Sequence, residues 1–243
     1  MTPGIVAEGV GVRFLFDRQS RRLSPTLARF RMRSTEMWGL RRVSCRLEPG
    51  EGVALLGLSG AGKTSLLRAF AGVYAPDEGR LEVRGRVATL LSLEAGLISS
   101  LTGRENALLL GILSGLSRAE ARAALHAIRE RTELGEAFER SVASYSQGMR
   151  ARLSFAVSEC SDPQILLLDE VHEALDHEFR DLVSGVAHEL LDRGGIVVAT
   201  GHDLPLLERL CGRALLLEDG GIRADGTFAE VQALYLGSQA PVP

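Results

Sequence analysis

The chain has 243 residues, of which 45% are hydrophobic and 24% charged, and its formal net charge is −3. This length and composition suit one large α/β domain, and they exclude a disordered tail, a collagen and a disulfide-stabilised miniprotein. The slight acidity argues against a dedicated nucleic-acid-binding protein, because such proteins carry a basic excess. The three cysteines, Cys45, Cys160 and Cys211, show no C-x-x-C spacing. They are expected to be free thiols that pack in a reducing compartment.

The N-terminus shows no targeting pattern. Residues 1–8 lack the basic and apolar regions of a signal peptide. The most apolar uncharged stretch, residues 106–117, is shorter than the roughly 20 residues that span a bilayer. We therefore expect a soluble, cytoplasmic protein that reaches a membrane only through a partner.

The first elements are strands separated by a basic segment. Alternating apolar residues over 5–16 predict a strand at the edge of a sheet. Residues 13–42 carry nine arginines against two carboxylates, for which a solvated charged face is the ordinary explanation. Residues 43–47 predict a second strand, and residues 48–51 a turn.

From residue 52 onward, short apolar runs alternate with helical patterns. The runs cover residues 53–57, 165–168, 196–200 and 214–217, and the helices 63–72, 148–160 and 178–193. Continuous apolar runs suit strands that are buried on both faces, as in a parallel sheet. The alternation therefore predicts a doubly wound α/β core. Residues 97–146 interrupt this alternation with mostly helical patterns, which predict an inserted helical subdomain.

The sequence GLSGAGKT at residues 57–64 matches the phosphate-loop pattern G-x-x-x-x-G-K-[ST] between a strand and a helix. Its glycines let consecutive N–H groups point at a phosphate, and the helix N-terminus adds partial positive charge. Lys63 is the single lysine among 28 lysines and arginines, and it suits the β- and γ-phosphates as a compact charge. The Thr64 hydroxyl can bind Mg²⁺. An ordinary glycine-rich turn before a helix is the plain alternative.

Two carboxylates follow the buried run at residues 165–168. Asp169 would hold Mg²⁺, directly or through water. Glu170 would polarise the attacking water as a general base or a positioning group. A strand that ends in a charged turn is the plain alternative, and the phosphate loop favours the metal and water roles.

With these motifs the chain resembles the ATP-binding-cassette (ABC) ATPases over nearly its whole length. Residues 144–149 (SYSQGM) are similar to the signature motif, residues 174–176 (ALD) to the D-loop, and residues 220–226 to a late hairpin. His202 resembles the switch histidine that senses the γ-phosphate, although a lone histidine is often an ordinary surface or core residue. Phe14 stands where an aromatic side chain stacks on adenine. Trp38 is expected to pack near the basic segment rather than to contact nucleotide.

The resemblance implies a P-loop NTPase core with a mainly parallel sheet, an N-terminal antiparallel β subdomain and an inserted α-helical subdomain. It implies one domain over residues 1–243, with residues 1–96 and 150–236 as the core and 97–149 as the helical subdomain. ATP and Mg²⁺ are the implied cofactors. The implied catalytic residues are Glu170 and His202, and Mg²⁺ would be held by Thr64 and Asp169. The implied ATP contacts are Phe14, Gly57, Ser59, Gly60, Ala61, Gly62, Lys63, Thr64, Ser65, Ser146, Gln147, Gly148 and Asp176.

The signature residues imply a dimer. Ser146 and the amide of Gly148 stand at the start of a predicted helix, which is an anion site. By the resemblance they would dock on the γ-phosphate bound by a second subunit, so that a symmetric homodimer encloses two ATP molecules. An ordinary serine N-cap is the plain alternative.

Short segments at 36–40, 101–106 (LTGREN), 145–149 and 228–236 are similar to the exporters of polysaccharide, O-antigen and teichoic acid. That branch also carries a long basic insert, as residues 17–42 do here. The resemblance implies an ATPase subunit that powers export of a lipid-linked glycan through a separate membrane permease, peripheral at the inner face of the membrane. The region 93–105 would meet the permease. The basic insert, with Arg29, Arg31 and Arg33, could lie near anionic headgroups.

Some residues depart from the family pattern and keep alternatives open. Residues 91–94 (LSLE) lack the usual glutamine, Gln147 replaces a small signature residue, and Gly201 replaces a serine. The alternatives are the ATPase of another ABC transporter and a divergent, weakly hydrolysing regulatory module. A cassette-type DNA-repair ATPase and a small-molecule kinase fit the sequence less well.

Overall fold

The computed structural model describes residues 2–16, 35–90, 96–169 and 177–239. The strands are β1 (Gly4–Phe16), β2 (Thr35–Leu47), β3 (Gly52–Leu56), β4 (Glu78–Arg84), β5 (Val87–Leu90), β6 (Ile165–Asp169), β7 (Ile196–Thr200), β8 (Arg213–Glu218) and β9 (Gly221–Thr227). The α-helices are α1 (Lys63–Phe70), α2 (Gly103–Leu113), α3 (Arg118–Thr132), α4 (Gln147–Cys160), α5 (His177–Asp192), α6 (Leu204–Leu210) and α7 (Phe228–Gln239). Within these ranges, 3-10 helices cover Gly135–Glu139 and Val142–Ser144. The predicted core strands and helices are confirmed, with ends within two residues.

The core is a six-stranded sheet in the order β5-β6-β7-β3-β8-β9. All neighbouring pairs are parallel except β8 and β9, which form the predicted late hairpin. Strands β3, β6 and β7 are buried along their whole length, as their unbroken apolar sequences require. The carboxyl ends of these three strands therefore meet at one edge of the sheet.

A second sheet of three antiparallel strands has the order β2-β1-β4. The prediction of an edge strand over residues 5–16 was wrong, because β1 pairs with β2 on one side and β4 on the other. Strand β2 also begins earlier than predicted, with Thr35 opposite Phe16. Residues 35–42 thus belong to a strand, and the rest of the basic insert lies outside the described residues.

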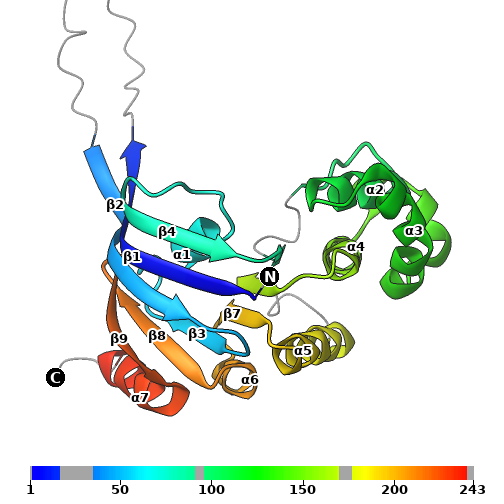
Figure 1. Cartoon of the computed structure of the whole chain (residues 1–243). Coiled ribbons are helices and arrows are strands. Elements are labelled where there is room, and N and C mark those ends of the chain that lie inside the picture. The colour runs from blue at the N-terminus through cyan, green and yellow to red at the C-terminus, as the bar shows by residue number, and fades with distance from the viewer. Residues whose placement is uncertain (1, 17–34, 91–95, 170–176, 240–243) are drawn as a thin grey trace, which may run out of the picture.

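The core has layers, and they are visible in Figure 1. Helix α1 lies between the two sheets, and its Leu66 and Leu67 share one buried cluster with residues of both. Helices α5, α6 and α7 cover the other face of the six-stranded sheet, where Val183, Leu207 and Phe228 are buried. The mixed α/β fold with two sheets confirms the predicted fold class.

The helical part, α2 to α4, packs around its own cluster of buried residues, which includes Ile128, Phe138 and Leu153. The N-termini of α2 and α3 are both fixed by capping boxes. Helix α4 faces two ways, because Leu153 packs in the helical cluster and Phe155 in the core cluster. Helix α4 continues across the predicted boundary between residues 149 and 150. The division of the chain into a core and a helical subdomain stays a prediction.

No helix within the described residues combines the length and the apolar character that crossing a membrane requires.

Candidate functional site

The loop between β3 and α1 can be built only with glycine at both ends. Gly57 and Gly62 have φ angles of 149° and 108°. A Cβ atom on Gly57 would lie 2.5 Å from the carbonyl oxygen of Leu217, and one on Gly62 would lie 2.8 Å from that of Gly39. Side chains are therefore excluded where the loop leaves the strand and where it enters the helix.

The N-terminus of α1 is suited to an anion. Its N-cap is Gly62, which supplies no side-chain hydrogen bond, and the first turn contains no acidic residue. The first amide groups of the helix therefore lack a side-chain cap, and the helix dipole adds partial positive charge. A phosphate group fits this arrangement.

Lys63 lies beneath the loop. Its side chain is buried, and Nζ donates hydrogen bonds to the carbonyl oxygens of Gly57 at 2.7 Å and Leu58 at 3.1 Å. A compact ammonium group can make these two bonds in a tight backbone loop, whereas the wide guanidinium fork of arginine would not fit there. The only lysine of the chain therefore occupies the position that most requires one.

A hydroxyl and a carboxylate meet beside the loop. Thr64 on α1 donates a hydrogen bond from Oγ1 to Oδ1 of Asp169, at 3.3 Å. Asp169 is the last residue of β6 and is buried. Mg²⁺ prefers oxygen ligands and commonly keeps several waters beside one or two carboxylates. This oxygen pair next to a phosphate site fits Mg²⁺.

A cleft of about 380 Å³ opens over the loop, within the size range of small-molecule sites. The predicted residues that line it are Phe14, Ser59, Gly60, Gly62, Lys63, Thr64, Ser65 and His202. Met37, Trp38 and Gly39 of β2 complete its wall. The cleft thus unites the antiparallel sheet, the loop and the end of β7 in one place.

The wall of the cleft carries an aromatic ring held from two sides. Phe14 packs edge-on against Tyr74, with ring centroids 5.3 Å apart and planes at 73°. A Cβ on Gly39 would lie 2.3 Å from Cε2 of Phe14, so the ring lies directly over the backbone of β2. Met37 is opposite Phe14 in the strand register. Sequence reasoning missed Met37 and Gly39, because only the β1–β2 register reveals them.

Trp38 packs as predicted and lines the cleft as well. The guanidinium carbon of Arg13 lies 5.4 Å from the centre of the Trp38 ring. A Cβ added to Gly11 would lie 2.8 Å from Cζ3 of the same ring. The indole is therefore fixed against β1 while it still faces the cleft.

Other predicted residues lie elsewhere. Ser146 is the N-cap of α4, and Gln147 and Gly148 begin the helix. None of the three is among the described residues that line the cleft. Oγ of Ser146 accepts a hydrogen bond from the amide of Met149 at 3.2 Å, as an N-cap does. Glu170 and Asp176 lie outside the described residues.

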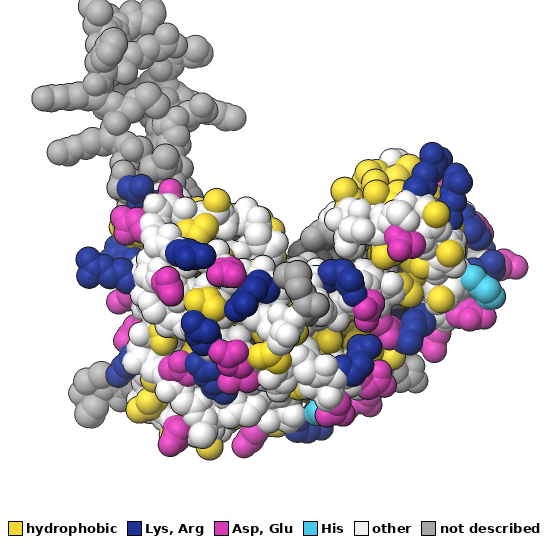
Figure 2. All heavy atoms as spheres, viewed as in Figure 1, with side chains coloured by type: hydrophobic (Ala, Val, Ile, Leu, Met, Phe, Trp, Pro, Cys, Tyr) yellow, Lys and Arg dark blue, Asp and Glu magenta, His cyan; other side chains and the backbone are white. Residues whose placement is uncertain are grey.

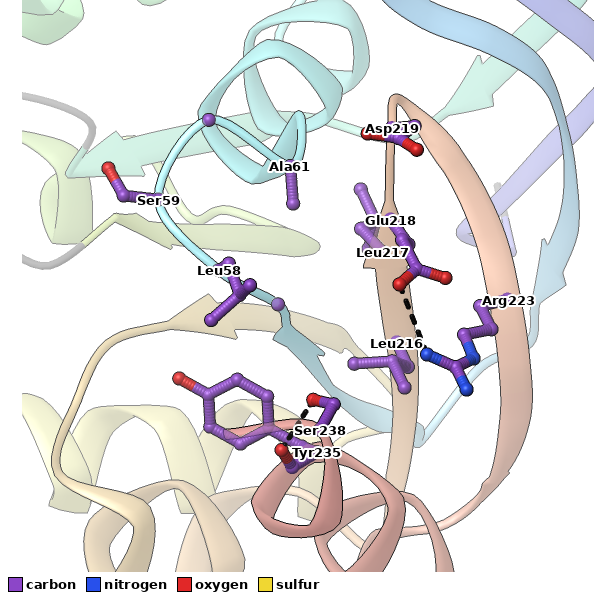
Figure 3. Close-up of a pocket in the computed structure, with 12 residues that line it drawn as sticks. Leu58, Ser59, Ala61, Leu216, Leu217, Glu218, Asp219, Arg223, Tyr235 and Ser238 are labelled. Atoms are coloured by element: carbon purple, nitrogen blue, oxygen red, sulfur yellow. Dashed lines mark hydrogen bonds and ion pairs between the residues drawn. The ribbon is translucent and has the colours of Figure 1, made fainter. Parts of the chain in front are cut away.

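The phosphate loop has a second pocket on its other side. It has a volume of about 230 Å³ and lies between the loop, β8 and α7 (Figure 3). Gly57 and Ala61 line this pocket, whereas Ser59 and Gly60 line both pockets. An ion pair between Glu218 and Arg223, 3.1 Å apart, forms one wall. The tip of the loop therefore has space on both sides, while its ends are packed against backbone.

Comparison with known proteins identifies the relatives of this chain. The family model described as ABC transporter matches residues 40–173. The O-antigen export system ATP-binding protein RfbB of Klebsiella pneumoniae is 36% identical, over 82% of this chain and 80% of that protein. RfbB of Myxococcus xanthus is 37% identical over 81% of this chain, which spans only 45% of that relative's length. The teichoic acids export ATP-binding protein TagH of Lactococcus lactis is 33% identical, over 82% of this chain and 43% of that protein.

Solved structures show the same fold. The dimeric ATP-binding cassette MJ0796 bound to ADP and Pi superimposes with a TM-score of 0.73 at 21% identity, covering 92% of this chain and 98% of that one. The ATP-binding subunit of an ABC transporter gives a TM-score of 0.72 at 22% identity, over 97% of this chain and 95% of that one.

Proposed function

Because this chain belongs to the ABC transporter family, we propose that it is the ATP-hydrolysing subunit of a transporter that exports a lipid-linked polysaccharide, O-antigen or teichoic acid through a separate membrane permease. The observation that carries the ATPase part is the single cleft that unites Phe14, Lys63, Thr64 and His202. The similarity to O-antigen and teichoic acid export proteins over about four fifths of the chain supports the substrate class.

The residues of the cleft divide the binding of ATP among them. The base packs against Phe14, and the phosphates lie on the amides of the loop and the start of α1. Lys63 turns from the Gly57 and Leu58 carbonyl oxygens toward the β- and γ-phosphates. Thr64 and Asp169 would hold Mg²⁺, which when bound would neutralise charge on the phosphate oxygens.

Hydrolysis then requires two further groups. Glu170, next to Asp169 in sequence, orients and polarises the attacking water. His202 follows β7 and lines the cleft, where it contacts the γ-phosphate. Both roles follow from the family resemblance. The position of His202 in the cleft supports its own role.

A second subunit completes the site. Ser146 and Gly148 lie at an exposed helix start that does not line the cleft of its own chain. The same residues of a second copy cover the γ-phosphate, and Asp176 lies at the dimer interface. ATP binding therefore favours the closed homodimer, and hydrolysis with release reopens it.

The permease would contact the helical part. Ile98, Ile112 and Leu113 are apolar and 44%, 40% and 70% exposed. Figure 2 shows hydrophobic side chains gathered over α2, on the side of the helical part that faces the core. An apolar surface of this kind suits a helix of a membrane partner. The arginines of the insert, among them Arg29, Arg31 and Arg33, would lie near anionic lipid headgroups.

The decisive experiment compares wild type with Glu170→Gln. Wild type should hydrolyse ATP only with Mg²⁺, and the variant should bind ATP without turning it over. Light scattering should show the variant as a monomer without nucleotide and as a dimer with Mg·ATP. A variant that binds ATP and stays monomeric would support the alternative regulatory module or a dimer held together by the permease. Co-purification with a permease tests the transport part, and Leu113→Glu, which places a charge on the exposed apolar surface, is the disrupting change.

A further inference from the structure

Thr200, the last residue of β7, carries a buried side-chain hydroxyl. The residue is fully buried, and among the residues that the structure describes its Oγ1 has no hydrogen-bond partner. A buried hydroxyl is more favourable when it donates a hydrogen bond. The Thr200 hydroxyl is therefore available to a neighbouring acceptor.

The hydroxyl lies next to the candidate metal site. In the parallel register of β6 and β7, Thr200 is the direct partner of Asp169. Two residues earlier on these strands, Leu167 and Val198 share one buried cluster with α1. Side chains alternate along a strand, so Thr200 and Asp169 point to this same face. Adjacent strands are about 4.8 Å apart, which brings the hydroxyl within reach of the carboxylate.

We propose that Thr200 is a positioning residue for Mg²⁺, and that its hydroxyl donates a hydrogen bond to the Asp169 carboxylate when Mg²⁺ and nucleotide occupy the cleft. This inference rests on the proposed function of the cleft. Carboxylates that hold a metal, directly or through water, are oriented by hydrogen bonds from neighbouring groups. Rotation about the single χ1 angle of Thr200 redirects its hydroxyl without moving the backbone.

The test is the isosteric change Thr200→Val, which we expect to affect stability and Mg²⁺-dependent binding in opposite directions. Without nucleotide, the melting temperature should stay equal or rise, because an unsatisfied buried hydroxyl is removed. The gain in affinity that Mg²⁺ gives to a non-hydrolysable ATP analogue, relative to EDTA, should fall about tenfold by titration calorimetry. Thr200→Ser keeps the hydroxyl and should retain most of that gain.

Ser154 on α4 offers a matched control, because its hydroxyl is also buried and unpartnered among the described residues. By the same argument, Ser154→Ala should leave the melting temperature equal or higher. It should leave the gain in nucleotide affinity from Mg²⁺ intact. Should valine fail to pack at position 200, Thr200→Ala must show the same loss relative to Thr200→Ser. A wild-type effect of Mg²⁺ in the valine or alanine variant would overturn the inference. If Mg²⁺ gives wild type no gain, the proposed metal site itself fails, and the inference fails with it.

Discussion

The Thr64 hydroxyl lies 3.3 Å from Oδ1 of Asp169, and this hydrogen bond joins residues that are 105 positions apart in the chain. It connects the first turn of α1 to the carboxyl end of β6. The glycine-rich loop and Asp169, the carboxylate proposed to hold Mg²⁺, therefore lie side by side, as parallel strands with neighbouring carboxyl ends require.

Asp169→Asn should uncouple nucleotide binding from Mg²⁺. The amide has the shape of the carboxylate but no charge, so we expect the affinity gain from Mg²⁺ to fall about 10- to 100-fold, with unchanged affinity in EDTA. Titration calorimetry with a non-hydrolysable ATP analogue measures both. Asp162→Asn is the control, since Asp162 is an exposed carboxylate whose positive φ asparagine tolerates. An unchanged dependence on Mg²⁺ in Asp169→Asn would exclude Asp169 as the metal carboxylate.

Gly39→Ala should weaken ATP binding through Phe14. The new Cβ would lie 2.3 Å from Cε2 of the ring, so the ring must leave its place on the cleft wall. Loss of one aromatic contact corresponds to about a 3- to 10-fold weaker affinity. Fluorescent-nucleotide titration measures the affinity, and Gly237→Ala is the control, since no atom of the described residues lies within 4 Å of the added Cβ.

A double-mutant cycle separates this mechanism from general damage. If Gly39→Ala acts by displacing Phe14, adding Phe14→Ala should cause no further loss. Fully additive losses would show that the two positions act independently.

Ser146→Ala should affect the dimer as well as the helix. Loss of the N-cap costs about 1 kcal/mol of stability. Ser117→Ala removes the serine N-cap of α3, which also belongs to a capping box, so the melting temperature of this control should fall by at least as much as that of Ser146→Ala. In a Glu170→Gln background, only Ser146→Ala should also raise the ATP concentration needed for dimers, measured by light scattering. Equal dimer formation in both variants would show that Ser146 acts only as the N-cap of α4.

Two buried thiols predict a loss of stability in alkaline solution. Burial raises the pKa of Cys45 and of Cys211 to about 12. In the unfolded chain a thiol ionises near pH 8.5, so above about pH 9 the unfolded state releases protons that the folded state retains. The free energy of unfolding should therefore be unaffected near pH 7 and should decrease as the pH rises from about 9 toward 12.

Urea unfolding at a series of pH values checks this expectation. A Cys211→Ala variant loses packing at every pH, yet its stability should decrease less steeply above pH 9 than that of wild type. Parallel curves for the two proteins would contradict the predicted role of this thiol.

The sequence alone was sufficient for the elements whose signals are local. Glycines at 57 and 62 followed by Lys63 predict a tight loop suited to a phosphate, because few backbone conformations suit that spacing. Unbroken apolar runs indicated the strands β3, β6, β7 and β8, because burial on both faces demands them. The fold class and the expected family followed from the order of these motifs.

Only the tertiary structure decided which distant residues meet. It made β1 a central strand, placed Met37 and Gly39 beside Phe14, and paired Thr200 with Asp169 in the strand register. These relationships depend on strand order and register, which long-range packing determines. A local pattern reports the conformation and burial of its own residues, and it carries no information about which strand will become their neighbour.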